Sequence, residues 1–194
     1  MEDVSAFVLA GGKSTRMGRD KALLVLDGRT LVERAVALAR LVSNHVWIVG
    51  DAKKYSRFGT VVEDLYVDRG PLGGIHAALA GSASQWNLML AVDLPFLSPD
   101  FLKWMIEVGS KAEAVVTVPR TGGGLQPLSA VYHQRFASTA VAALEAGRNK
   151  IDASFREVKT RIIDEDEITR QGYPLEMFRN VNTPEEWERV VSNW

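Results

Sequence analysis

Runs of consecutive apolar residues recur along the first two-thirds of the chain, and segments with helical spacing of apolar residues separate them. Strands that helices cover on both faces have this continuous apolar character, whereas half-exposed strands alternate. The pattern predicts five buried strands, at residues 4–9, 46–49, 60–62, 88–92 and 114–118. Two later segments, 128–132 and 160–163, alternate more and are expected nearer an edge of the sheet.

Helix-start signals lie between these runs. Thr30 and Glu33 form a capping box for a helix to about residue 42, and Ser98-Pro99 supplies an N-cap and N1 proline for a helix to about residue 108. Further helices are predicted at 74–83, at 136–146 and after Thr183-Pro184-Glu185-Glu186. Strands that alternate with helices predict an α/β fold in three layers (αβα), with a Rossmann-like, mainly parallel sheet. No linker divides the chain, so we expect a single domain over residues 1–194.

The segment after the first predicted strand reads LAGGKSTRMGRDK over residues 9–21. Its glycines let the backbone approach a ligand, and its N–H groups and the next helix N-terminus attract anions. Arg16 and Lys21 add full positive charge, so this loop is expected to hold a polyphosphate. It fits neither the P-loop nor the G-x-G-x-x-G spacing. Asp20 either fixes the direction of Lys21 or is simply solvated.

Composition narrows the function classes. The 194 residues are 46% apolar and carry a net charge of −1, so no global basic field favours nucleic acid. The chain has no cysteine, which removes disulfides and thiolate chemistry and fits a cytoplasmic location. No secretory signal pattern and no apolar run of the ~20 residues that span a bilayer is present, so no membrane role is expected. The histidines are scattered without metal-ligand spacing, and we interpret them as structural.

Asp93 directly follows the strand predicted at 88–92, in a loop that contains Pro95. Open α/β sheets bind ligands beyond the carboxyl ends of their strands. A carboxylate at that place suits Mg²⁺, which commonly combines one or two carboxylates with substrate phosphates. Taken alone, an aspartate here is more often a cap or turn residue.

Four segments between residues 9 and 186 resemble the molybdenum cofactor guanylyltransferase family of small nucleotidyltransferases. The first loop matches the family pattern LAGG-x-S-x-RMG-x-DK, and Asp93 matches its D-x-P element. Residues 70–74 (GPLGG) are similar to its second glycine-rich segment, and residues 180–184 read NVNTP, as its C-terminal loop does. The resemblance implies the fold of nucleotide-diphospho-sugar transferases.

The same resemblance implies transfer of GMP from GTP to the phosphate of molybdopterin, or of its molybdenum-bound form, with release of pyrophosphate. Mg²⁺ is the implied cofactor, and other cofactor-biosynthesis or molybdoenzyme proteins are implied further partners. The implied catalytic residues are Arg16, Lys21 and Asp93. The implied nucleotide contacts are Leu9, Ala10, Gly11, Gly12, Ser14, Lys21, Asp64, Gly73 and Asp93. The implied second-substrate residues are Gln126, Asn180 and Asn182, and Asn182 joins Asp93 as a metal contact.

Several positions leave alternatives open. Asp64 either contacts the nucleotide or belongs to an acidic turn that caps a helix, and Asn180 and Asn182 are of a type that also forms ordinary turns. Gln126 stands where relatives often have histidine, so its role is open.

The nucleotide is open as well. Gly11-Gly12 favours guanine because cytidylyl relatives commonly read Leu-Ala-Ala-Gly there. The alternatives are a cytidylyltransferase on the same pterin, nucleotide transfer to a sugar or polyol phosphate, and a non-catalytic nucleotide-binding module.

Overall fold

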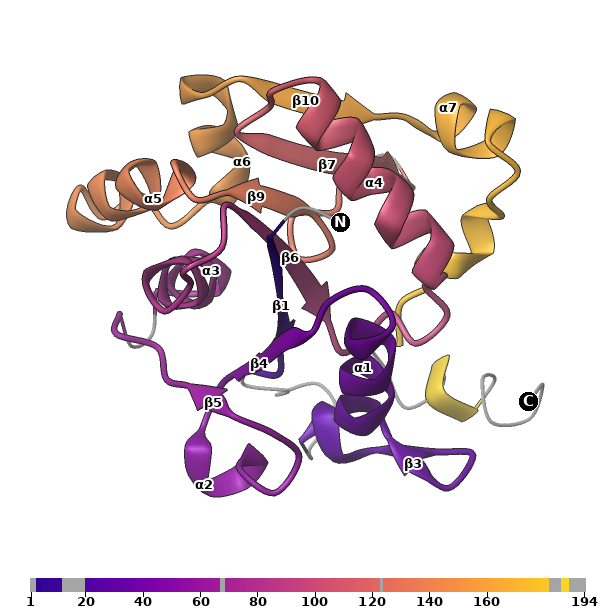
Figure 1. Cartoon of the computed structure of the whole chain (residues 1–194). Helices are drawn as coiled ribbons and strands as arrows, with labels where there is room; N and C mark the ends of the chain where they lie inside the picture. The colour runs from indigo at the N-terminus through magenta and orange to yellow at the C-terminus, as the bar shows by residue number, and fades with distance from the viewer. Residues whose placement is uncertain (1–2, 12–19, 67–68, 123, 182–185, 189–194) are drawn as a thin grey trace.

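The computed structural model describes residues 3–11, 20–66, 69–122, 124–181 and 186–188. Within these residues, an eight-stranded sheet forms the centre of the molecule (Figure 1). Its strands are β1 (Val4–Leu9), β4 (His45–Val49), β5 (Val61–Val62), β6 (Trp86–Ala91), β7 (Val116–Thr121), β8 (Gly124–Leu125), β9 (Val131–His133) and β10 (Thr160–Ile163). They lie in the order β10-β7-β9-β6-β1-β4-β5, and β8 pairs with β7. A separate hairpin joins β2 (Val25–Leu26) to β3 (Arg29–Thr30).

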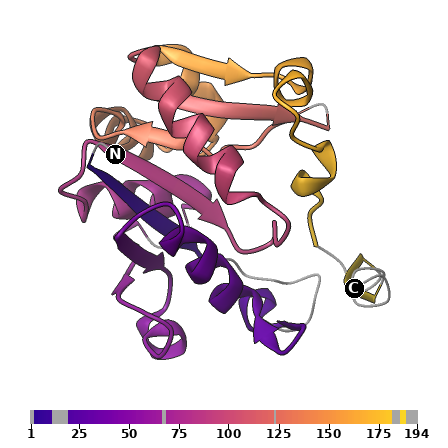
Figure 2. The ribbon, with the colours of Figure 1, turned by 45° about the vertical axis from the view of Figure 1, so that its right-hand side comes forward.

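The sheet is mainly parallel, as the sequence predicted. β6, β1, β4 and β5 are parallel neighbours, and β7 is parallel to β10. β9 runs antiparallel to both β6 and β7 (Figure 2). Leu9 pairs with Val49 on one side and with Ala91 on the other, so β1, β4 and β6 end at the same level.

The expected edge position of residues 128–132 was wrong. β9 lies in the interior of the sheet, between β6 and β7. Its polar atoms can be buried because they find partners inside the protein: the Tyr132 hydroxyl donates to the Pro127 carbonyl at 2.7 Å. An alternating pattern therefore did not mean an exposed face here, whereas β10 does lie at an edge as expected.

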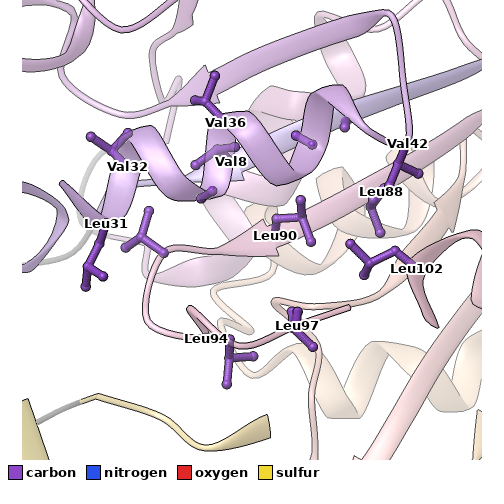
Figure 3. Close-up of a cluster of buried hydrophobic side chains, with 14 of the residues drawn as sticks. Val8, Leu31, Val32, Val36, Val42, Leu88, Leu90, Leu94, Leu97 and Leu102 are labelled. Atoms are coloured by element: carbon purple, nitrogen blue, oxygen red, sulfur yellow. The ribbon is translucent and has the colours of Figure 1, made fainter. Parts of the chain in front are cut away.

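Helices cover both faces of the sheet. The residues of β1 alternate between two core clusters: Val8 packs with α1 (Leu31–Arg40) and α4 (Pro99–Lys111), whereas Phe7 packs with α3 (Pro71–Ala80) and α5 (Phe136–Glu145). Figure 3 shows side chains of the first cluster from β6 (Leu88 and Leu90) and from α1 (Leu31, Val32 and Val36). The three predicted layers are therefore present. The smaller helices are η1 (Lys21–Leu23), α2 (Ala52–Tyr55), α6 (Ile151–Ser154), η2 (Phe155–Glu157), α7 (Glu165–Arg170) and η3 (Leu175–Phe178).

Local signals account for the helix starts. At α1 both halves of the predicted capping box form, because Glu33 N donates to Thr30 Oγ1 and Thr30 N donates to Glu33 Oε2. At α4 the Ser98 side chain accepts backbone N–H groups of the first turn. α3 starts earlier than predicted, at Pro71, because proline is well suited to the first helical position. Most of the last predicted capping motif lies outside the described residues, which show helix at 186–188.

The chain connections locate a ligand-binding edge. β1 leads through α1 to β4 on one side, and β5 leads through α3 to β6 on the other side of β1. The carboxyl ends of β1 and β6 thus flank the point where the strand order reverses, which is where open α/β sheets bind ligands. None of the helices in the described ranges has the length and apolar character needed to cross a membrane.

Candidate functional site

The loops that leave β1 and β6 bring a lysine and a carboxylate together. The ammonium nitrogen of Lys21, at the start of η1, lies 3.1 Å from Asp93 Oδ2. The two side chains are 16% and 26% exposed, so both remain partly accessible to a ligand. A partly exposed ion pair contributes at most about 1 kcal/mol to stability. Its importance is therefore its place at the ligand-binding edge of the sheet, where it joins two of the predicted catalytic residues.

Asp20 is not simply solvated. Its carboxylate accepts the Ala22 N–H at 3.1 Å, which makes it the N-cap of η1, and the ammonium group of Lys54 at 3.2 Å. Asp20 therefore fixes the start of the turn that carries Lys21. This resolves the alternative that the sequence left open.

The backbone after β1 stays hydrogen-bonded to the end of β4. Ala10 N and Gly11 N both donate to the Val49 carbonyl, at 3.0 and 3.2 Å. Leu9 itself still pairs within the sheet. The N–H groups of Ala10 and Gly11 are therefore engaged with the end of β4. Of the predicted site residues, Gly12, Ser14, Arg16 and Asn182 lie outside the described part of the chain.

A second pair of predicted residues lies at the start of α3. A Cβ atom at Gly73 would stand 2.7 Å from Asp64 Oδ2 and 3.0 Å from the Tyr66 carbonyl oxygen, so only glycine fits there without a shift. Asp64 Oδ1 accepts the Tyr66 N–H at 2.8 Å. Burial raises the pKa of the Asp64 carboxyl, and the Tyr66 hydrogen bond and the nearby His76 partly offset that rise. The carboxylate is thus half-buried and held against the glycine-rich segment, beside β5.

The C-terminal segment reaches the same edge of the sheet. Val181 N donates to the Asp93 carbonyl at 3.0 Å, and the Arg179 guanidinium lies 4.8 Å from the centre of the Phe96 ring, in the loop that follows Asp93. Asn180 lies between these two contacts and is partly exposed. The predicted approach of this segment to Asp93 is therefore present up to residue 181.

Gln126 is placed by β7 and its hairpin. Its backbone N–H donates to the Pro119 carbonyl at 2.8 Å, and its side-chain amide donates to Thr121 Oγ1 at 3.0 Å. Since β7 is parallel to β6 across β9, Gln126 lies at the carboxyl edge of the sheet, two strands away from Asp93. No hydrogen bond between the described atoms links it to Asp93.

Sequence reasoning missed two contributors to this edge. The Tyr55 hydroxyl contacts both Ala10 and Asp20, and Arg179 packs on Phe96. Neither belongs to a motif, so the sequence carried no signal for them. In the described ranges no three His, Cys, Asp or Glu side chains gather as a preformed metal site.

Comparison with known proteins gives consistent results. Residues 6–161 match the model of the MobA-like NTP transferase domain family. The chain is 36% identical over 186 residues to a probable molybdenum cofactor guanylyltransferase of Pelotomaculum thermopropionicum, covering 95% of this chain and 90% of that protein. It is 34% identical to the molybdenum cofactor guanylyltransferase of Desulfosudis oleivorans, with 98% and 95% covered. The crystal structure of molybdopterin-guanine dinucleotide biosynthesis protein A from Archaeoglobus fulgidus superposes with a TM-score of 0.85 at 25% identity, with 97% of each chain covered.

Proposed function

The chain belongs to the MobA-like NTP transferase family, and from this premise we propose that it transfers GMP from GTP to the terminal phosphate of molybdopterin, or of its molybdenum-bound form. The observation that carries the proposal is the Lys21–Asp93 pair, 3.1 Å apart at the point where the strand order reverses. The names of the relatives support guanine as the base and the molybdenum cofactor as the acceptor, and the name of the solved structure contains molybdopterin-guanine dinucleotide. Further partner proteins, a cytoplasmic location and a single domain over residues 1–194 belong to the same proposal.

The reaction requires positioning and charge neutralisation. An oxygen of the pterin phosphate attacks the α-phosphorus of GTP, a new P–O bond forms, and the bond to the bridging oxygen breaks in line to release pyrophosphate. Both reactants are anionic, so a fixed cation at the reacting phosphates lowers the barrier. Lys21 is assigned this role together with Arg16. No general base is needed, because a phosphate monoester is already largely ionised near neutral pH.

Asp93 is assigned to hold Mg²⁺. The Asp93 carboxylate suits this ion, because Mg²⁺ commonly binds one or two carboxylates and takes its other ligands from phosphates and water. The carboxylate is partly exposed, and its second oxygen, Oδ1, is not the one that faces Lys21. Asn182 is assigned as a further contact. When bound, Mg²⁺ would neutralise charge on the nucleotide phosphates; the protein's own part is to hold Asp93 at the end of β6.

Asp64 and Gly73 are assigned to the nucleotide. The Asp64 carboxylate fills the place where a Cβ atom would stand at Gly73, so it is held against the start of α3. When ionised, this carboxylate can only accept hydrogen bonds. Guanine presents two adjacent N–H donors on one edge, which suit a carboxylate. Leu9, Ala10, Gly11, Gly12 and Ser14 are assigned to the same ligand through the first loop. Asn180 and Gln126 are assigned to the second substrate.

Thermal unfolding tests the nucleotide assignment first. The purified chain is unfolded with Mg²⁺ and, in turn, GTP, CTP, ATP or UTP. A ligand at 100 times its dissociation constant stabilises by about 2.7 kcal/mol, which raises the melting temperature by several degrees. A selective rise with GTP supports guanylyl transfer, and a selective rise with CTP or UTP moves the function to a sister enzyme. No rise with any nucleotide contradicts the assignment of the first loop.

A transfer assay tests the chemistry. With GTP, Mg²⁺ and molybdopterin, pyrophosphate should be released in step with formation of the dinucleotide. Nucleotide binding without pyrophosphate release would instead favour a non-catalytic nucleotide-binding module. Release with a sugar or polyol phosphate but not with molybdopterin would identify a different acceptor.

A further inference from the structure

One buried phenol joins the two ends of the first loop. The Tyr55 hydroxyl lies 3.1 Å from the Ala10 carbonyl oxygen, where the chain leaves β1. It also lies 3.0 and 2.9 Å from the two carboxylate oxygens of Asp20, where the chain enters η1. Both acceptors are therefore within reach of a single O–H group, although they lie 45 and 35 residues away from Tyr55.

The local sequence places the phenol there. Asp51 is the N-cap of α2, and Lys53 and Lys54 are exposed, whereas Tyr55 is 3% exposed. The ring lies against Gly50, since a Cβ atom at that position would be only 2.9 Å from Tyr55 Cε2. Because Gly50 has no side chain, the Tyr55 ring has room to extend from α2 to the end of β1.

The contact continues toward the site. The carboxylate that receives the Tyr55 hydroxyl also caps η1, and the next residue is Lys21, which pairs with Asp93. A hydrogen bond to a charged acceptor is stronger than one between neutral groups, and the bond from Tyr55 to Asp20 is partly buried. Fixing Asp20 therefore fixes the start of the turn from which the Lys21 side chain extends.

We propose that Tyr55 is a positioning residue for guanylyl transfer, which holds the ends of the first loop together and thereby sets the place of Lys21. The residue does not touch the nucleotide; it acts through Asp20 and Ala10. This inference rests on the proposed function for its kinetic consequence, but its structural consequence exists without any nucleotide.

The phenol keeps its proton under all working conditions. Burial, the hydrogen bond to Asp20 and the negative charges of Asp20 and Asp51 raise the pKa of Tyr55 far above its usual value. The hydroxyl is therefore a hydrogen-bond donor at every pH of the assay. Its effect on kcat/KM should be the same across the assay range, about pH 6 to 9.

Tyr55→Phe is the test, because it keeps the ring over Gly50 and removes only the hydroxyl. With GTP as the varied substrate, kcat/KM should fall about tenfold or more, because losing a hydrogen bond to a charged group typically has an effect of that size. KM for the second substrate should stay within about twofold of the native value. Tyr173→Phe is the matched control: it removes a phenol hydroxyl that donates to the Asp100 carbonyl at 3.2 Å, away from the site, and should leave both constants unchanged. The ratio between Tyr55→Phe and the native protein should be the same across the pH range.

Amide hydrogen exchange without nucleotide separates this inference from the proposed function. In Tyr55→Phe the amides of Gly11 and Ala22 should exchange about tenfold faster, while those of the distant helix α5 keep their native rates. Faster exchange in a protein that shows no guanylyl transfer would overturn the proposed function and leave the structural role standing. Native exchange rates at both amides, or a fall in kcat/KM shared equally by Tyr173→Phe, would overturn the role of Tyr55.

Discussion

The backbone N–H of Val181 donates a 3.0 Å hydrogen bond to the carbonyl oxygen of Asp93. This contact joins the C-terminal segment to the loop after β6, so the residue beside it, Asn180, stands next to the assigned metal ligand. The side chain of Val181 is fully buried, which anchors the contact in the core. A segment distant in sequence is thereby made part of the same sheet edge.

Asn180→Ala should affect the second substrate and not the nucleotide. KM for molybdopterin is expected to rise about tenfold, because a polar contact made by one amide side chain corresponds to roughly 1–2 kcal/mol. The stabilisation by Mg²⁺ and GTP in thermal unfolding should remain native. An equal loss of GTP-dependent stabilisation would instead assign Asn180 to the nucleotide.

Lys21→Ala should lower kcat by a hundredfold or more while the protein stays folded. A preorganised charge contact at a transition state is worth about 3–4 kcal/mol, whereas the partly exposed pair with Asp93 adds at most about 1 kcal/mol to stability. Steady-state kinetics and the melting temperature measure the two effects separately. Native turnover in this variant would remove Lys21 from the mechanism.

Asp93→Ala should abolish turnover that depends on Mg²⁺. The expected result is no activity at any Mg²⁺ concentration, because the only carboxylate assigned to the ion is lost. Asp100→Ala is a suitable control, since Asp100 is an exposed residue in the first turn of α4. Turnover that still rises with Mg²⁺ in Asp93→Ala would show that the metal ligand lies elsewhere.

Gly73→Ala should weaken nucleotide binding about tenfold or more. The added methyl group would stand 2.7 Å from Asp64 Oδ2 and 3.0 Å from the Tyr66 carbonyl oxygen, so the segment beside α3 has to move. Gly59→Ala is the control, because its Cβ would meet Ile48 at an ordinary 3.5 Å. Titration with GTP measures the affinity. Equal affinities in the two variants would show that the nucleotide does not bind against the segment around Gly73.

Asp64→Asn should stabilise the fold at pH 7 and weaken GTP binding. Burial raises the pKa of Asp64 in the folded state above its unfolded value, so the ionised carboxylate makes the native protein less stable. This destabilisation is absent below the ordinary pKa. It grows as the pH rises from the ordinary pKa to the raised pKa of the folded state, and it is constant above that value. The asparagine keeps an acceptor for the Tyr66 N–H without the charge.

Denaturant unfolding at several pH values checks the Asp64 prediction. The difference in the free energy of unfolding between Asp64→Asn and the native protein should be positive at pH 7 and vanish toward pH 3. A difference that is independent of pH would mean that the carboxylate is not the cause. A gain in stability together with unchanged GTP affinity would take Asp64 out of the nucleotide site.

The sequence determined the elements that depend on neighbours along the chain. Continuous apolar runs located β1, β4 and β6, and the capping box of Thr30 and Glu33 located the start of α1, since hydrophobic periodicity and end capping act within a few residues. The glycine and charge pattern of residues 9–21 also predicted a phosphate-binding loop after β1, because a close backbone approach and a phosphate charge restrict the residue types themselves.

Only the tertiary structure decided which of these residues meet. Lys21 and Asp93 are 72 residues apart, and they face each other because β1 and β6 pair in a register that ends both strands at one level. The interior place of β9 and the reach of Tyr55 to Asp20 follow from the same strand order and packing. Long-range pairing depends on the register and connections of the whole sheet, and no local pattern encodes it.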